Sequence, residues 1–417
     1  MKAKKSKFSG TMFRDIGQLL TLEDASAKTG RNILTEDLSV LSRAAMIEEG
    51  GKIVWVGEEK KIPKEYAKLK IKELSLGGAP VMPAFVESHT HLAFSGDRAD
   101  EFEWRNLGQS YQEIAKQGGG ILNTIQPTRD TSEEELAYVA QARANDFASQ
   151  GVATLEAKSG YGLTLKDELK ILRATGYLRG PRIVRTYLGP HAIPPEHKSA
   201  DSYLKEILDT HLTKVRDEEL ACRVDIFVED GYFSVAQAEK YLTAAKKLGF
   251  DLVVHADQLT HSGGAKLAVK MGAKSADHLL CINASDIKAL AASKTTCVLL
   301  PAADLYVSCP YPPARKLIDA GARVALATDF NPGSSPTRDL SLIGVLARAQ
   351  MKMSLAEVIS AYTLGGAYAL GLEGSVGSLE VGKSCDFITL SADWDRIFYA
   401  IGVPVVAQTW REGRQIF

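Results

Sequence analysis

Two histidines that stand two residues apart are the clearest chemical signal in the sequence. His89 and His91 follow the apolar run Val-Met-Pro-Ala-Phe-Val at 81–86, which is typical of a buried strand. Side chains at positions i and i+2 of a strand project to the same side. Two imidazoles that project together from a strand end can begin a metal site.

Further metal-capable side chains stand at the ends of other apolar runs. His255 directly follows Asp-Leu-Val-Val at 251–254, and Asp329 follows a similar run. His191 and His278 also stand where short apolar segments end. A single buried histidine is usually a hydrogen-bonded core residue, so each position alone predicts little. The repetition of the pattern at five strand ends predicts one metal centre.

Three histidines and one carboxylate supply the expected ligands of this centre: His89, His91, His255 and Asp329. Nitrogen and oxygen ligands around a divalent ion, with one position left for water, suit Zn²⁺, and also Fe²⁺ or Mn²⁺. A second metal ion would need a bridging ligand such as a carbamylated lysine. Lys158, which follows a strand-like segment, is a candidate, although a lysine that binds no metal is the simpler expectation.

Three other histidines, His197, His211 and His261, lie in polar segments of the sequence. We therefore expect all three at the surface and outside the metal centre.

The composition of the chain is that of an ordinary globular protein, with 45% hydrophobic and 24% charged residues over 417 positions. The 50 basic and 51 acidic residues give a formal net charge of −1, which offers no electrostatic footprint for nucleic acid or an anionic membrane. No apolar run approaches the ~20 residues of a membrane helix, and the basic residues 1–8 are not followed by the apolar core of a secretory signal. The five cysteines are scattered, so we expect no disulfide framework, no cysteine zinc site and a reducing, cytosolic compartment.

Strands that alternate with amphipathic helices must position these side chains. Between residues 79 and 375, β-branched runs alternate with helical stretches. This alternation predicts a parallel sheet, and a length of about 290 residues suits a (β/α)₈ barrel, with a doubly wound sheet as the alternative. In a barrel the carboxyl ends of the strands meet on one face, which would bring the metal-capable side chains together. The helices are expected at 133–150, 166–178, 234–248, 263–271 and 354–370.

The two ends of the chain have a different pattern, with short strands and turns. Residues 1–78 contain an expected hairpin that turns near Gly50. Residues 376–417 contain expected strands at 382–390 and 405–410. We therefore expect a small β-sandwich domain that is assembled from both ends and flanks a barrel domain at 79–375.

The sequence also resembles a known enzyme family. The segment Val-Met-Pro-Ala-Phe-Val-Glu-Ser-His-Thr-His at 81–91 is similar to the first barrel strand of the amidohydrolase superfamily, and the segment at 374–386 is similar to its tail. More narrowly, the chain resembles the imidazolonepropionase family, in segments that lie largely outside the shared metal ligands. These segments run in order through the barrel, at 91–98, 113–121, 158–163, 189–194, 255–259, 275–279 and 327–333.

The resemblance implies a metal-dependent hydrolase built on a (β/α)₈ barrel. Members of the family hydrolyse the ring amide of 4-imidazolone-5-propanoate to N-formimidoyl-L-glutamate in histidine degradation. For this chain the resemblance implies one divalent ion, zinc or iron, a homodimer and a cytoplasmic location. The implied ion ligands are the four residues named above, and the implied contacts to substrate or product are Arg98, Tyr161, His191, Gln258, Asn331, Gly333 and Ser334.

The chemistry of several of these residues agrees with the implied reaction. The planar fork of Arg98 fits the propionate carboxylate of the substrate. Tyr161 offers a phenol donor on a loop flanked by glycines. Asp329 can take a proton from water and pass it to the departing ring nitrogen. His278 can stabilise the developing oxyanion with a hydrogen bond.

Position 258 separates related activities. Related mononuclear deaminases carry His-x-x-Glu at this place, whereas the chain has His255-Ala-Asp-Gln258. A neutral amide is neither a general acid nor a general base, which argues against a deaminase. We assign Gln258 to orientation of the substrate, and proton transfer to Asp329 with His278.

Two other functions stay open at this stage. One is a different mononuclear amidohydrolase that acts on another cyclic amide or amidine. The other is a catalytically silent barrel that serves as a scaffold, although the complete set of ligand types argues against it.

Overall fold

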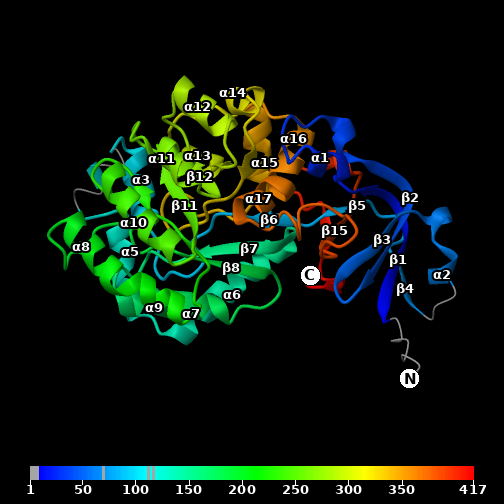
Figure 1. Ribbon diagram of the computed structural model, residues 1–417, viewed down its shortest axis with the longest axis horizontal. Coiled ribbons are helices and arrows are strands. Elements are labelled where there is room, and N and C mark those ends of the chain that lie inside the picture. Colours follow the sequence, from blue (N-terminus) through cyan, green and yellow to red (C-terminus); the bar gives the residue numbers. More distant parts are fainter. Residues whose placement is uncertain (1–8, 68–70, 110–112, 115–117) are drawn as a thin grey trace.

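The computed structural model describes residues 9–67, 71–109, 113–114 and 118–417. Residues 1–8, with the basic segment noted above, lie outside this description. A barrel surrounded by helices lies beside a smaller sheet (Figure 1).

Parallel strands form the barrel that the sequence predicts. In the described ranges, nine short strands occupy eight positions in the order β14-β13-β12-β11-β9-β8-β7-β6, with β10 beside β11. A bridge between Thr90 and Phe330 joins the first strand to the last. There the N–H of Asp329 donates to the carbonyl of His89 at 3.1 Å, so the backbone that closes the ring carries two of the expected ligands. The strands are β6 (Phe85–Glu87), β7 (Val152–Lys158), β8 (Arg182–Tyr187), β9 (Arg223–Val224), β10 (Phe227–Val228), β11 (Asp251–Ala256), β12 (Ser275–His278), β13 (Thr296–Leu299) and β14 (Val324–Leu326).

Amphipathic helices cover the outside of the barrel, close to the positions that periodicity predicts. Four of them are α6 (Glu133–Ser149), α7 (Leu165–Gly176), α10 (Val235–Lys247) and α11 (Gly264–Met271). The start of α6 is fixed by a capping box, in which the Ser132 side chain accepts the N–H of Glu135. The other helices around the barrel are α3 (Ala99–Asn106), α5 (Ile121–Asp130), α8 (Ala200–Glu206), α9 (Leu212–Asp217), α12 (Ala284–Ala291), α13 (Pro301–Tyr306), α14 (Ala314–Asp319) and α15 (Leu340–Ala349).

The expected helix at 354–370 contains a π-helical turn. It consists of α16 (Leu355–Ser360), the π turn η4 (Ala361–Gly365) and α17 (Gly366–Leu370). A Cβ atom on Gly365 would lie 2.2 Å from the carbonyl oxygen of Val324, and one on Gly366 would lie 2.4 Å from that of Val86. These glycines let the helix pack directly on β14 and β6, the strands that precede Asp329 and His89.

Both ends of the chain contribute to the small β unit, as the sequence predicts. Within the described residues its eight strands form one mixed sheet in the order β17-β16-β15-β5-β1-β2-β3, with β4 beside β1. The strands are β1 (Gly10–Leu20), β2 (Val40–Glu49), β3 (Lys52–Glu58), β4 (Lys72–Ser75), β5 (Val81–Pro83), β15 (Phe387–Leu390), β16 (Val406–Arg411) and β17 (Arg414–Gln415). The N-terminal part also contains α1 (Glu23–Ala27), α2 (Lys64–Ala67) and the 3-10 turns η1 (Thr35–Leu38) and η2 (Glu59–Lys61), and the C-terminal part contains the 3-10 turn η5 (Trp394–Arg396).

The small sheet curls over a core of its own. The N–H of Ile53 in β3, the last strand of the order, donates to the carbonyl of Lys383, just before β15, so the sheet folds back on itself. The rings of Phe13, Phe387 and Trp410 pack inside this curl. The two layers expected of a sandwich are therefore continuous with one another. The domain boundaries near residues 78 and 375 stay a prediction.

The expectation for His211 is wrong, because this residue is buried. It ends the π turn η3 (Ile207–His211), its Nδ1 lies 2.7 Å from the hydroxyl of Tyr187, and its Nε2 lies 3.1 Å from Glu206. Both ring nitrogens therefore have hydrogen-bond partners, which lets the imidazole be buried in a segment whose polar sequence predicts exposure. His261 is exposed, and His197 is partly buried.

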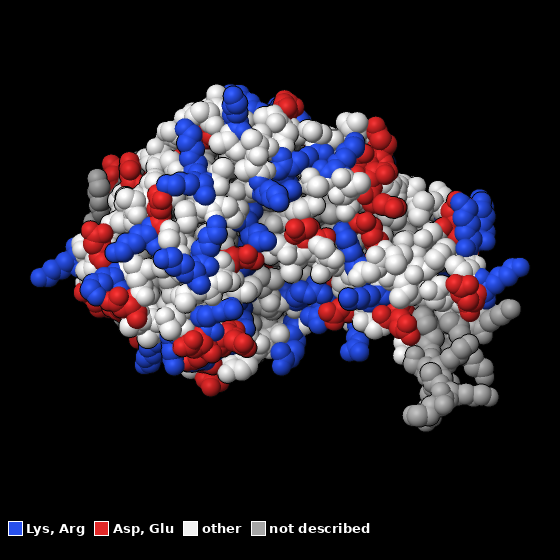
Figure 2. Space-filling view, viewed as in Figure 1, with Lys and Arg blue, Asp and Glu red and all other residues white. Residues whose placement is uncertain are grey.

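The surface carries both signs of charge. Figure 2 shows basic and acidic side chains distributed over the visible face, from the barrel to the small sheet. None of the described helices is long and apolar enough to cross a membrane. All five cysteines are free.

Candidate active site

A cavity at the carboxyl ends of the barrel strands collects the side chains that the sequence singled out. Ten of the predicted site residues line it, and they come from the loops and ends that follow six different strand positions. The other two, Gly333 and His89, do not line it. The lining residues are His91, Arg98, Ile121, Tyr161, His191, Phe227, His255, Gln258, His278, Asp329, Asn331 and Ser334.

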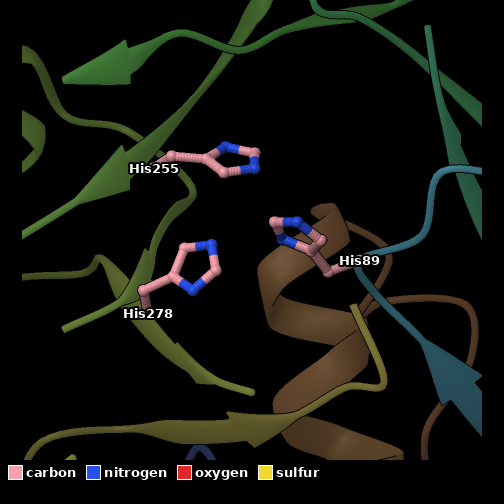
Figure 3. Close-up of side chains that lie close together, drawn as sticks. All are labelled: His89, His255 and His278. Atoms are coloured by element: carbon pink, nitrogen blue, oxygen red, sulfur yellow. The ribbon is translucent and has the colours of Figure 1, made fainter. Parts of the chain in front are cut away.

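The four expected metal ligands lie in one buried cluster. His89 and His91 follow β6, His255 lies in β11, and Asp329 follows β14. The Oδ1 atom of Asp329 lies 3.3 Å from Nε2 of His89 and 3.5 Å from Nε2 of His91. His278 joins the cluster from β12, and its ring faces those of His89 and His255 (Figure 3). Potential ligand atoms of His91, His191 and His255 also lie within 4.8 Å of one another.

Two aspartates orient the histidines from behind. Nδ1 of His89 lies 2.6 Å from Oδ2 of Asp277, and Nδ1 of His255 lies 3.0 Å from Oδ2 of Asp225. All four side chains are buried. The Asp277 carboxylate that accepts the Nδ1 proton of His89 fixes its tautomer and directs its Nε2 lone pair to the opposite side. Asp225 holds His255 through the charge of its carboxylate at 3.0 Å.

This arrangement fits a divalent cation. Nε2 of His89 is buried and has no hydrogen-bond partner in the described part of the chain. With its proton on Nδ1, the ring presents only a lone pair to the Asp329 oxygen 3.3 Å away. Two electron-rich atoms that face each other in a dry site repel unless a cation lies between them. The donor set, imidazole nitrogen with carboxylate oxygen, is one that zinc and iron accept.

The protonation states of the cluster follow from its burial. Burial lowers the pKa of His89 and of His91, with further lowering from neighbouring cationic groups. Burial also lowers the pKa of His278 to about 3, although Asp329 opposes the shift. His278 is therefore neutral near pH 7, and can donate a hydrogen bond without carrying charge.

Two site residues have strained backbones. Asp329 has φ 52° and His278 has φ 78°, both in the left-handed region that favours glycine. Such strain persists only where surrounding structure fixes it, and it is concentrated at functional sites. The carboxylate of Glu87 helps to fix the backbone at Asp329, because this carboxylate accepts the N–H of the preceding residue, Thr328, at 3.1 Å.

Arg98 lies against the loop that follows Asp329. A Cβ atom on Gly333 would lie 1.4 Å from Nη2 of Arg98, so the guanidinium occupies the space that any side chain would need. The Asn331 side chain shapes this loop, because its Oδ1 accepts the N–H groups of Gly333 and Ser334, each at 2.8 Å. Its amide also donates to the carbonyl of Asp329 at 2.7 Å. The two expected substrate-contacting segments therefore form one wall.

Replacing Gly333 with Ala should displace the Arg98 guanidinium. Since a misplacement of about 1 Å can cost roughly 10²-fold in rate, we expect kcat/KM to fall by about that factor, mainly through KM. Gly374→Ala is the matched control, because a Cβ atom there meets nothing within 4 Å. Steady-state kinetics of both variants test this prediction, and equal kinetics for the Gly333 variant and the unmodified protein would contradict it.

Tyr161 and His191 form another part of the cavity wall. Nδ1 of His191 lies 2.9 Å from the carbonyl oxygen of Gly160, and its ring stacks on that of His91 at 5.0 Å. The Tyr161 ring meets His191 edge-on at 5.4 Å. Gly160 has φ 108°, and a Cβ atom there would lie 2.9 Å from Nδ1 of His191. The loop after β7 therefore requires glycine to bring Tyr161 and His191 together.

One buried carboxylate outside the cavity gives a pH-dependent prediction. Asp304 in α13 is fully buried, and neither carboxylate oxygen has a hydrogen-bond partner in the described residues. Burial raises the pKa of Asp304 well above its usual value, and the charge of Asp329 adds to the shift. The folded state therefore holds this proton at pH values where the unfolded chain has lost it.

Replacement of Asp304 with Asn removes this ionisation. The proton on Asp304 stabilises the folded state fully below the ordinary aspartate pKa of about 3.9. As the pH rises from there toward the pKa of Asp304 in the folded protein, the free energy of unfolding falls by about 1.4 kcal/mol per pH unit. We therefore expect Asp304→Asn to raise Tm relative to the unmodified protein, and by more at pH 7 than at pH 5. A Tm difference that stays constant or shrinks between the two pH values would contradict the assignment.

Several residues of the site were not found from the sequence. Asp225 and Asp277 orient two histidines, and Glu156 in β7 accepts a hydrogen bond from Lys158. Each stands at or near a strand end, the same signal that identifies Asp329. Ile121 and Phe227 form apolar parts of the cavity wall, and no sequence pattern separates them from core residues.

Comparison with known proteins places the chain among enzymes. Residues 81–416 match the model of the amidohydrolase family. A protein of Bdellovibrio bacteriovorus named imidazolonepropionase is 54% identical over 413 residues, which cover 99% of this chain and 98% of that protein. A Clostridium tetani protein of the same name is 38% identical over 416 residues, which cover 99% of each chain.

Solved structures of distant relatives share the fold. An adenosine deaminase from Xanthomonas campestris with bound zinc has a TM-score of 0.69 at 18% identity, over 97% of this chain and 92% of that one. Atrazine chlorohydrolase from Arthrobacter aurescens, complexed with zinc, has a TM-score of 0.70 at 16% identity, over 97% of this chain and 94% of that one. Identities this low speak for the architecture alone.

Proposed function

Because the chain belongs to the imidazolonepropionases of the amidohydrolase family, we propose that it hydrolyses 4-imidazolone-5-propanoate to N-formimidoyl-L-glutamate in histidine degradation. The observation that carries this proposal is a single cavity that combines a buried histidine and aspartate cluster with an arginine. The cluster suits hydrolysis of an amide, and Arg98 suits the propionate of this substrate.

The cluster would hold one divalent ion, zinc or iron, through His89, His91, His255 and Asp329. This set is supported by the short separations between Asp329 and the first two histidines, and by the aspartates behind His89 and His255. When bound, the ion would polarise the substrate carbonyl and make water a stronger acid.

Asp329 and His278 would manage the proton and the developing charge. Asp329 takes a proton from the attacking water and delivers it to the ring nitrogen as the carbon–nitrogen bond breaks. The carbonyl carbon gains the water oxygen and becomes the α-carboxylate of the product. His278, which is neutral, donates a hydrogen bond to the oxygen that becomes negative during the attack.

The remaining cavity residues would bind and orient the substrate. Arg98 pairs with the propionate, and Tyr161 and His191 contact the ring from another part of the cavity wall. Gln258 orients the substrate by hydrogen bonding, since a neutral amide transfers no proton. Asn331 positions Gly333 and Ser334, whose loop contacts substrate or product.

We further propose that the enzyme is a homodimer of the cytoplasm, as in the resemblance noted from the sequence. Light scattering of the purified protein at micromolar concentration tests the oligomeric state. A mass of two chains is expected, and a mass of one chain would contradict it.

A substrate panel tests the proposed reaction. The purified protein is incubated with 4-imidazolone-5-propanoate, a hydantoin, a dihydropyrimidinone and adenosine, and the products are identified by NMR. We expect N-formimidoyl-L-glutamate from the first compound and turnover of the others that is lower by orders of magnitude. Preferred turnover of a different cyclic amide would assign the site to another amidohydrolase activity, and no turnover of any compound would favour a silent scaffold.

A further inference from the structure

A buried lysine next to the metal cluster has no role in the reaction described above. Lys158 ends β7, and its side chain is fully buried. Glu156 lies two residues earlier, so both side chains project from the same side of β7. The backbone N–H of Lys158 donates to the carbonyl of Thr90, the residue between His89 and His91, at 2.9 Å.

The ammonium group of Lys158 contacts three carboxylates. Nζ donates to Oε1 of Glu156 and to Oδ2 of Asp225, each at 2.8 Å, and lies 4.0 Å from Oδ2 of Asp277. All three carboxylates are buried. A buried carboxylate is strongly unfavourable unless it is paired, so the lysine stabilises this group as a whole.

Two of these carboxylates are the ones that orient metal ligands. The same Asp225 oxygen that accepts from Lys158 lies 3.0 Å from Nδ1 of His255. The same Asp277 oxygen that faces Lys158 lies 2.6 Å from Nδ1 of His89. Two chains of contacts thus run from a single ammonium group, through one aspartate each, to two neighbouring histidines of the cluster.

We propose that Lys158 is a positioning residue that sets the affinity of the site for its metal ion, by holding Asp225 and Asp277 in the orientation that directs His255 and His89. The inference rests on the metal site of the proposed function. It also replaces the alternative in which Lys158 is a carbamylated bridge between two metal ions. A carbamate would add a negative charge beside Asp225 and Glu156, where the structure has an ammonium group that donates to both.

The test measures the affinity for metal directly. Metal-free unmodified protein and Lys158→Met are titrated with Zn²⁺ in competition with a chromophoric chelator. Loss of residues that orient metal ligands typically weakens metal binding by 10–100-fold, so we expect Kd to rise by about that factor, with one ion per chain in both proteins. The visible spectrum of the Co²⁺-loaded variant should change as well, because the histidines lose their fixed orientation.

Two further variants separate positioning from general stability. Lys170→Met is the matched control, because Lys170 is a largely buried lysine of α7 that donates to the carbonyls of Thr128, Arg129 and Thr131. It should keep the Zn²⁺ affinity and Co²⁺ spectrum of the unmodified protein. Lys158→Arg retains the positive charge and should recover part of the lost affinity.

The outcomes decide between the proposals. If metal-free Lys158→Met has an unchanged Tm and binds Zn²⁺ within about twofold of the unmodified protein, the inference is wrong while the metal site stands. If the unmodified protein binds two ions per chain, the carbamate alternative replaces it. If the unmodified protein binds no Zn²⁺ or Fe²⁺ tightly, the metal site itself is wrong, and the inference falls with it. Should Lys158→Met fail to fold, the double variant Glu156→Gln/Lys158→Met removes one unpaired carboxylate, and the same criteria apply.

Discussion

Replacing Asp329 with Asn is expected to lower kcat/KM for the ring-opening hydrolysis by about 10⁴-fold or more. General acid–base transfer contributes about 10²–10⁴-fold, and loss of a metal ligand adds to this. Asn cannot accept the proton of water, although it preserves the size of the side chain. The decrease should appear mainly in kcat, and it should persist when the protein is supplied with excess metal.

The control for this variant is Asp319→Asn. Asp319 ends α14, where its exposed carboxylate pairs with Arg315 at 2.8 Å, away from the cavity. It should keep the kcat and KM of the unmodified protein. Thermal unfolding of both variants shows whether the fold is retained. A folded Asp329→Asn protein with more than about a tenth of the original kcat would exclude Asp329 as the group that transfers the proton.

The second large effect is expected for Arg98→Met. Hydrogen bonds to charged groups contribute about 1.5–3 kcal/mol each, so loss of a two-pronged contact to the propionate should cost roughly 10³-fold in kcat/KM. Most of this loss should appear in KM, because the propionate does not take part in the bond cleavage. Arg98→Lys keeps the charge without the planar fork, so its kcat/KM should lie between that of the unmodified protein and that of Arg98→Met.

An altered substrate tests whether Arg98 acts on the propionate itself. The propionamide analogue of the substrate lacks the negative charge, so the unmodified protein should turn it over poorly. Arg98→Met should then lower the rate with this analogue by much less than it lowers the rate with the natural substrate. Equal losses with both substrates would show that Arg98 supports the fold of the cavity instead.

The sequence was sufficient to predict that the histidines of the cluster and Asp329 come together, because barrel geometry makes strand ends converge. His89, His255 and Asp329 are far apart in the chain, but each follows a recognisable apolar run. The helices were predictable for a similar reason, since their apolar period is regular and caps such as Ser132 mark where they begin.

Features that depend on contacts between distant segments could not be predicted. The close contact between Gly333 and Arg98 joins loops after the last and first barrel strands, and only the fold brings them together. The same is true of Lys158, whose role depends on Asp225 and Asp277, two carboxylates that other strands of the barrel bring to it. His211 was misplaced because the polar segment around it predicted exposure, whereas Tyr187 and Glu206 satisfy both ring nitrogens of the buried imidazole.

The most direct test of the whole account follows the ultraviolet absorbance of freshly generated 4-imidazolone-5-propanoate. The decay is recorded with purified protein as isolated, after treatment with a chelator, and after zinc or iron is restored. We expect rapid decay, loss of that decay on chelation, and recovery on addition of metal. Decay no faster than the spontaneous reaction, in protein that contains its metal, would contradict the proposed function.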